Sequence, residues 1–228
     1  CSKNRHYGAA PMTAEHGTPD DRGSAGTGWL EVPVPAAGAQ RLFDEDVAEL
    51  GYVMNASRMW ARQPETFLGL FELMQGNIDT HGLDPRQRGI LVTACASALG
   101  DAYCSLAWGG KLTKVAGADI AAGVLRGDDD GLTAAERAMA GWARKVTRDP
   151  NHTDRADVQE LRDAGYSDDQ IFGVTVFVAL RIAFSTINDA LGARPDAAYR
   201  TTAPDAVLGA VTFGRPIDDP PPEAPGEQ

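Results

Sequence analysis

Cationic residues and cysteines are both scarce in this chain of 228 residues. Lys and Arg total 21 against 32 Asp and Glu, which gives a formal net charge of −11. Because such a surface repels phosphate backbones, the charge argues against a nucleic-acid partner. The three cysteines (Cys1, Cys95 and Cys104) are too few for a disulfide scaffold, and their number is typical of a reducing cytosol. We therefore expect a cytoplasmic protein in which a thiol is either a buried small side chain or a reactive group.

Long hydrophobic runs and cofactor motifs are also missing. The most apolar stretch, Ile171 to Leu180, is shorter than the roughly 20 residues that a membrane span needs, and Arg181 follows it directly. No basic segment followed by an apolar one opens the sequence, so we expect neither a signal peptide nor a membrane partner. No two histidines have metal-ligand spacing with Cys or an acid, and no glycine-rich phosphate loop is present. We therefore expect no metal and no organic cofactor.

The composition divides the chain into one domain and two polar ends. Residues 1–28 are rich in Gly, Ser, Asp and Pro and cannot bury enough apolar surface to offset their ordering entropy, so we expect a disordered arm. Residues 201–228 are predicted to form an extended or disordered tail, because residues 216–228 hold five prolines and four acids. Residues 29–200 lie between these ends and form the predicted helical domain.

Helix-start signals recur within residues 29–200, and strand patterns are nearly absent. Thr133–Glu136 and Ser167–Gln170 have the spacing of capping boxes, and Asp84 has Pro at the next position and Gln three positions later. These signals predict an all-α fold. One expected helix, residues 170–191, is apolar around its whole circumference and must be covered on every side. A single small domain seldom covers a helix in this way, so we also predict a homo-oligomer.

Cys104 has a local setting that favours reactivity. Gly100 and Asp101 interrupt an apolar helix, and if Asp101 is the N-cap of the next helix, Cys104 falls at its third helical position. The positive end of a helix dipole lowers the pKa of a thiol placed there. The alternative is that Cys104 is only a small buried residue, as most free cysteines are.

The residues around Cys104 carry a family resemblance. The run Asp101–Trp108 (DAYCSLAW), followed by Lys111–Gly117 (KLTKVAG), resembles the signature of the alkyl hydroperoxidase D-like / carboxymuconolactone decarboxylase family. Flanking segments are similar to its peroxidase-related branch, so the resemblance covers roughly residues 42–195. It implies an all-helical bundle, assembled as a symmetric homo-oligomer, that acts on a small-molecule hydroperoxide.

The chain departs from the catalytic pattern of that branch. Active members share a Glu, a Cys-x-x-Cys pair and a His four residues after the second Cys. By position these fall on Gly89, Asp101, Cys104 and Trp108, so only the second Cys is retained. The resemblance therefore implies a thiol peroxidase that acts through a single cysteine, Cys104, and depends on an external thiol reductant. Asp101 is the second candidate site residue.

The charge of Asp101 and the distance to Cys95 both argue against a strongly activated thiol at Cys104. An ionised Asp101 at roughly 5 Å opposes the Cys104 thiolate by about 3 kcal/mol at an effective dielectric constant near 20, so we expect it to raise the pKa of Cys104. Cys95 is a poor resolving thiol, because nine residues of continuous helix rise roughly 13.5 Å and a disulfide needs Cα atoms within about 7 Å. Two alternatives to a peroxidase therefore remain: a catalytically degenerate helical homo-oligomer with a binding or assembly role, and cofactor-free lactone chemistry.

Overall fold

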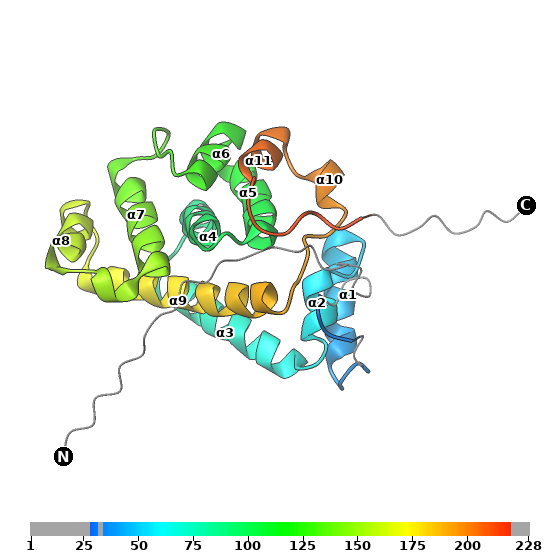
Figure 1. The fold of residues 1–228 in the computed structure, drawn as a ribbon. Coiled ribbons are helices and arrows are strands. Elements are labelled where there is room, and N and C mark those ends of the chain that lie inside the picture. The colour runs from blue at the N-terminus through cyan, green and yellow to red at the C-terminus, as the bar shows by residue number, and fades with distance from the viewer. Residues whose placement is uncertain (1–27, 32–33, 220–228) are drawn as a thin grey trace, which may run out of the picture.

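The computed structural model describes residues 28–31 and 34–219 of the chain, and in that part all regular structure is helical (Figure 1). The all-α prediction is therefore confirmed for the described residues. The helices in chain order are α1 (Ala39–Leu50), α2 (Asn55–Trp60), α3 (Pro64–His81), α4 (Pro85–Leu99), α5 (Ala102–Ala116), α6 (Ala118–Arg126), α7 (Ala134–Arg148), the 3-10 turn η1 (Pro150–His152), α8 (Arg155–Asp163), α9 (Asp168–Ala190), α10 (Tyr199–Thr202) and α11 (Asp205–Ala210).

Local side-chain caps begin three of the long helices where the sequence predicts them. Thr133 and Ser167 each accept a hydrogen bond from the backbone N–H three residues later, and the side chains of Glu136 and Gln170 accept one from the backbone N–H of the cap residue. Asp84 forms the same reciprocal pair at the start of α4. Each cap satisfies backbone N–H groups that a helix start leaves unpaired, so the sequence signals fix the helix starts.

Helix α4 lies at the centre of the fold and packs against α5, α6, α7 and α9 (Figure 1). Its residues from 89 to 96 are all buried, with Ile90 and Leu91 fully inaccessible. Helix α3 packs along α9 on one side of this core. The arrangement places the start of α5 and the middle of α9 on either side of a shared interior.

Helix α9 is the long apolar helix that the sequence predicts. By length and composition alone it could cross a membrane, but it packs against α3, α4 and α7, and 44% of its most apolar window is buried. We therefore describe it as a core helix. Part of its surface remains uncovered within the chain, and Phe172 is 68% exposed.

The ordered helices extend beyond residue 200, where the sequence predicts an extended tail. Helix α10 crosses that boundary, and α11 packs against α6 and α5 with Val207 and Ala210 buried. The predicted boundary is too early because the proline-rich composition begins only at residue 216, whereas the preceding residues carry apolar side chains at helical spacing. The predicted N-terminal arm lies, except for Gly28, outside the described residues.

Candidate active site

Asp101 and Cys104 meet at the start of α5. Asp101 is the N-cap, and its Oδ1 accepts a hydrogen bond from the backbone N–H of Cys104 at 2.8 Å. Gly100 ends α4 in the left-handed region (φ 76°), which lets the chain turn between the two helices. The predicted cap and the third helical position of Cys104 are thus confirmed. Both side chains are buried, with exposed fractions of 0% for Asp101 and 2% for Cys104.

Two residues of α9 face Cys104, and no sequence motif marks either of them. Arg181 Nη2 lies 3.3 Å from Cys104 Sγ, and Ser185 Oγ lies 3.6 Å from the same sulfur. Residues four apart in a helix share a face, so one turn of α9 presents both groups to the thiol. Arg181 is 3% exposed and Ser185 is 1% exposed. The thiol is therefore enclosed by charged and polar groups, although it lies inside the core.

The guanidinium of Arg181 has an unusual set of neighbours for a buried cation. It lies 5.5 Å from the centre of the Trp108 ring and 5.0 Å from that of Phe184, and its Nη1 is 4.0 Å from Met74 Sδ. Among the described residues, no carboxylate forms an ion pair with it. A buried charge without a close partner costs folding free energy unless a ligand or a reaction uses it.

Burial and charge together raise the pKa of Cys104 above its ordinary value. Desolvation is the largest cause, followed by the negative charge of Asp101. Arg181 and Ser185 act in the opposite direction but do not outweigh them. The predicted effect of Asp101 is confirmed, whereas the lowered pKa and partial exposure that would make Cys104 a strongly activated thiol are not observed. Cys104 carries its proton in the resting protein at neutral pH.

Several polar atoms around the thiol have no hydrogen-bond partner. Within the described part of the chain these include Asp101 Oδ2, Arg181 Nε and Ser105 Oγ, and all three atoms are buried. Native proteins leave few buried polar atoms unpaired, because each costs the desolvation of the group. Here a free acceptor and a free charged donor belong to the two side chains that flank Cys104. These two atoms are therefore the candidate contacts for a further polar group beside the thiol.

The other positions of the family pattern supply no acid or base. A Cβ added to Gly89 would lie 2.9 Å from Leu112 Cδ1 and 3.3 Å from Leu112 Cβ, so a glutamate there would have to displace the Leu112 side chain. Trp108 packs against Arg181 and cannot exchange a proton as His does. Cys95 and Cys104 are both free thiols, as expected from their separation. The buried carboxylate of Asp101 raises the pKa of the Cys104 thiol.

A second buried polar cluster holds the first turn of α5 in place. Tyr103 OH donates to Asp196 Oδ2 at 2.5 Å, and Asp196 Oδ1 accepts a hydrogen bond from the Asn55 backbone N–H at 2.7 Å. Burial raises the pKa of Asp196 above its ordinary value. These bonds link α2, α5 and the segment after α9, so the residue next to Cys104 is anchored from two directions.

In the described residues, no group of three or more His, Cys, Asp or Glu side chains is placed to hold a metal ion.

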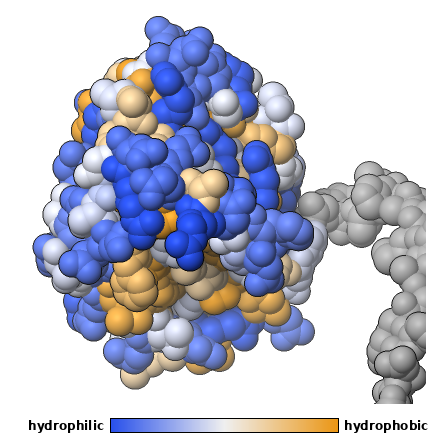
Figure 2. All heavy atoms as spheres, turned by 90° about the vertical axis from the view of Figure 1, so that its left-hand side faces the viewer, coloured by the Kyte–Doolittle hydropathy of each residue, from blue (hydrophilic) through white to orange (hydrophobic). Residues whose placement is uncertain are grey.

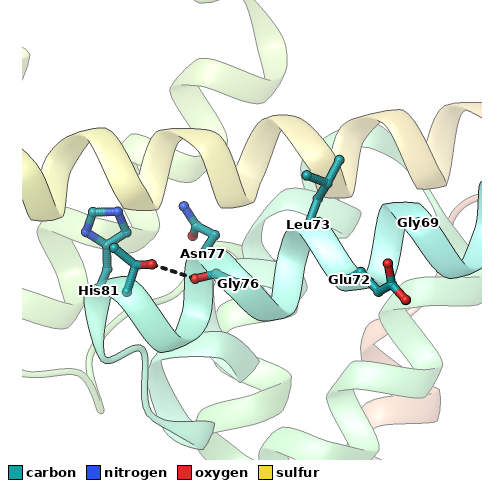
Figure 3. Close-up of a pocket in the computed structure, with 7 residues that line it drawn as sticks. Gly69, Glu72, Leu73, Gly76, Asn77 and His81 are labelled. Atoms are coloured by element: carbon teal, nitrogen blue, oxygen red, sulfur yellow. Dashed lines mark hydrogen bonds between the residues drawn. The ribbon is translucent and has the colours of Figure 1, made fainter.

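An open groove of about 720 Å³ runs along α3, separate from the Cys104 site. Figure 3 shows Leu73, Asn77 and His81 projecting from one side of α3 where α9 passes. Gly69 and Gly76 leave open space between these side chains, and Leu73 is 63% exposed. The groove is open to solvent and holds no cysteine, so it does not contribute to the thiol chemistry.

Comparisons with known proteins identify the fold. No sequence-family model and no curated protein sequence matches the chain. Among solved structures, a peroxidase-related protein from Silicibacter sp. TM1040 matches with a TM-score of 0.68 and 20% identity over 81% of this chain and 98% of that one. The alkylhydroperoxidase AhpD core protein from Ralstonia eutropha JMP134 matches with a TM-score of 0.63 and 22% identity, over 83% and 98% of the two chains. The debrominase Bmp8, in complex with 2,3,4-tribromopyrrole, matches with a TM-score of 0.63 and 21% identity, over 84% and 100%.

The chain therefore has the alkylhydroperoxidase D-like fold that its sequence resemblance predicts. At these identities the likeness describes the fold alone, and the named activities belong to the matched proteins. Since the same fold occurs in peroxidase-related proteins and in a debrominase, the chemistry of this chain must be argued from its own site.

Proposed function

We propose that this protein is a thiol-dependent oxidoreductase that reduces hydroperoxides through the single cysteine Cys104. The observation that carries the proposal is the 3.3 Å contact between Arg181 Nη2 and Cys104 Sγ inside the core. A cation buried against a thiol stabilises negative charge on the sulfur or on an atom bonded to it. Since that cation has no carboxylate partner among the described residues, catalysis explains its cost better than structure does.

The guanidinium geometry suits an oxygen placed beside the sulfur. The Nε–H and one N–H of Nη2 project from the same edge of a guanidinium. In Arg181, Nη2 contacts the sulfur while Nε has no partner in the described residues. An oxygen that approaches Cys104 Sγ along this edge would accept a hydrogen bond from Nε. Arg181 thus stabilises the charge that develops when a peroxide bond breaks.

Asp101 takes the part of the acid and base in the proposed reaction. Cys104 Sγ attacks one oxygen of the hydroperoxide, so that an S–O bond forms while the O–O bond breaks. The thiol proton moves to Asp101 Oδ2 and then to the leaving oxygen, which departs as an alcohol or as water. The product is a sulfenic acid on Cys104. Two equivalents of an external thiol then reduce the sulfenic acid, releasing water and the disulfide of that thiol.

Peroxide-dependent sulfenylation of the purified protein tests the proposal directly. We expect a cyclic 1,3-dione to label Cys104 after peroxide addition in the native protein, and we expect Cys104→Ser to lose both this label and any peroxide turnover with an added thiol. Cys95→Ser is the matched control, because Cys95 is also a free and buried thiol. Mass spectrometry of the Cys104 peptide gives the readout.

A different result would favour the binding or assembly role. If Cys104 labels only after denaturation while peroxide leaves the native protein unchanged, the thiol is structural. The raised pKa of Cys104 would then mean only that the buried thiol stays protonated, and Asp101 would not take up its proton.

We also propose that the exposed face of α9 binds a second copy of this chain. From Phe172 to the end of α9 this face carries only uncharged exposed residues, namely Phe172, Ala179, Ala183, Thr186, Ile187 and Ala190. A chain with a net charge of −11 repels its own copies elsewhere, so an uncharged face is the favoured place for self-contact. Figure 2 shows hydrophobic residues gathered in the lower half of the side on which α9 begins, with hydrophilic residues above.

The shape of this region also fits a twofold contact. The exposed side chain of Leu73 protrudes beside the groove that Gly69 and Gly76 line on α3, and α3 packs along α9. A twofold interface needs such self-complementarity, since each copy contributes the same patch. The inner face of α9 carries Arg181 and Ser185, so a second copy would also hold the active-site helix in place.

Charge placed on this face is expected to separate the copies. We expect the wild-type chain to run as an oligomer in size-exclusion chromatography with light scattering, and Phe172→Lys to run as a monomer at the same micromolar concentration. Val115→Lys is the matched control, because Val115 is an exposed apolar residue on α5 and not on α9. A monomeric wild-type protein, or equal masses for the wild type and Phe172→Lys, would contradict the proposed interface.

A further inference from the structure

The C-terminal segment of residues 211–219, here called the strap, crosses the start of α5 where Asp101 and Cys104 lie (Figure 1). Its closest approach is at Gly214, which has a left-handed backbone (φ 72°). A Cβ added to Gly214 would lie 2.4 Å from the carbonyl O of Gly100 and 2.8 Å from the backbone N of Ala102. Gly100 and Ala102 are the two neighbours of Asp101 in the chain. Only a glycine therefore lets the strap lie so close to the N-terminal end of α5.

The far end of the strap is anchored by several hydrogen bonds. The Asp218 backbone N–H donates to the carbonyl O of Pro195 at 2.8 Å. Arg200 donates to the carbonyl O atoms of Ile217 and Asp218 at 2.8 and 3.1 Å. Asn55 Nδ2 adds a bond of 3.3 Å to the Asp218 carboxylate. The near end continues from α11, so both ends of the strap are held.

The middle of the strap is held differently. From residue 212 to residue 216 the strap forms no hydrogen bond with any other described residue. Its contacts there are the approach of Gly214 to α5 and the guanidinium of Arg215, which lies 5.2 Å from the centre of the Trp29 ring. Arg215 also acts on the half-buried Asp189 of α9, whose pKa burial and the charge of Asp101 raise to about 7. A segment fixed at both ends but free of hydrogen bonds between them can lift without unfolding the domain.

We infer that the strap is the cover of the Asp101–Cys104 site and that reagents and substrates reach Cys104 only when residues 212–216 lift from α5. This inference extends the proposed function, because the cover then selects hydroperoxides by size. Hydrogen peroxide needs a smaller opening than a bulky aryl hydroperoxide. The strap also accounts for a polar, chemically equipped site that is nevertheless inaccessible in the closed structure.

The test displaces the strap in the full-length protein and measures thiol access. In Gly214→Val the side chain collides with backbone atoms of α5 and the positive φ is strained, so the strap must lift. We expect the Cys104 peptide to react with methyl methanethiosulfonate about tenfold faster or more than in the wild type. Gly209→Ala is the matched control: Gly209 lies in α11, and an added Cβ there has no neighbour within 4 Å. Its labelling rate is expected to stay within about twofold of the wild type.

A second variant and a second measurement test the inference even if Gly214→Val does not fold. Arg200→Gln removes the three hydrogen bonds that Arg200 donates to Ile217, Asp218 and Asp219 without entering the site, and it replaces Gly214→Val if that variant does not fold. Hydrogen exchange of residues 211–219 reports whether the strap has lifted. Faster exchange with an unchanged labelling rate of Cys104 would overturn the inference. Methanethiosulfonate reacts with any accessible thiolate and needs no peroxide, so this result is independent of whether Cys104 reacts with peroxide.

Discussion

Replacing Asp101 by Asn is expected to slow the oxidation of Cys104 by peroxide about 100-fold at pH 6, with the difference shrinking as the pH rises. Asp101 and Cys104 share one proton in the proposed mechanism, and the reaction needs that singly protonated pair. The wild-type rate should therefore change little from pH 6 to pH 9, because burial and the charge of Asp101 hold the pKa of Cys104 above its ordinary value and the thiol keeps its proton. Stopped-flow mixing or timed dione labelling at each pH gives both profiles.

The Asp101→Asn profile should instead rise with pH. The charge of Asp101 raises the pKa of Cys104, so its removal lowers that pKa, although burial still holds it above the ordinary value. Without a base, the variant reacts only through its thiolate, and the thiolate fraction grows tenfold with each pH unit below the thiol pKa. A flat wild-type profile beside a rising variant profile is the signature of proton transfer within the pair.

A second asparagine substitution, at the N-cap of α4, serves as the control for any effect of the cap itself. Asn caps helices about as well as Asp, so α5 should remain intact in Asp101→Asn. Asp84→Asn changes the corresponding cap of α4 and should leave the oxidation rate unchanged. If Asp101→Asn reacts faster than the wild type at every pH, Asp101 only opposes the thiolate, and the proposed base is wrong.

The elements that the sequence predicts here are those governed by local interactions. The caps at Asp84, Asp101, Thr133 and Ser167 depend on residues three positions apart, and all four lie where the sequence places them. The position of Cys104 follows directly from the Asp101 cap. The fold follows from the run around Cys104, because that run resembles a known family.

Arg181 and the strap depend on contacts between distant parts of the chain. Arg181 lies 77 positions from Cys104 in the chain. In the sequence it is simply the charged residue that follows an apolar stretch. Its signal was nevertheless present: a single arginine inside a long apolar helix must be buried at a cost, with a serine one turn later on the same face. The strap does not stand out in the sequence, since Pro216, Asp218, Asp219 and the proline-rich residues that follow are typical of a solvated tail. Only tertiary packing of Gly214 on α5 distinguishes a cover from a tail.

Replacing Arg181 by Met is expected to slow Cys104 oxidation by about two to three powers of ten, the usual cost of losing one donor to a developing anion. Two effects act in the same direction. The charge of Arg181 lowers the pKa of Cys104, so its loss leaves an even smaller thiolate fraction. The leaving oxygen also loses its donor. Arg181→Lys keeps a positive charge but not the two-donor edge, and partial recovery of the rate is expected.

The same substitution is expected to leave the folded state at least as stable as the wild type. Burying a cation without a close carboxylate costs several kcal/mol, whereas its stacking on Trp108 and Phe184 returns about 1–2 kcal/mol per ring. Met fills a similar volume with no desolvation cost. The balance favours the variant by about 1 kcal/mol, which corresponds to a rise of about 2–4 °C in the midpoint of thermal unfolding.

Arg144→Met provides the contrast, because Arg144 is the buried arginine that does have a carboxylate partner. It bonds Asp129 through two nitrogens at 2.7 and 2.8 Å, and it also donates to the carbonyl O of Val124 at 3.0 Å. Its removal leaves that carboxylate unpaired, so we expect a loss of about 3 kcal/mol in stability and no change in the rate of Cys104 oxidation per folded molecule. A residue retained for structure loses stability when truncated, and one retained for chemistry loses rate. If Arg181→Met instead behaves like Arg144→Met in both calorimetry and labelling, then Arg181 is a structural residue and the proposed reaction loses its anion-stabilising group.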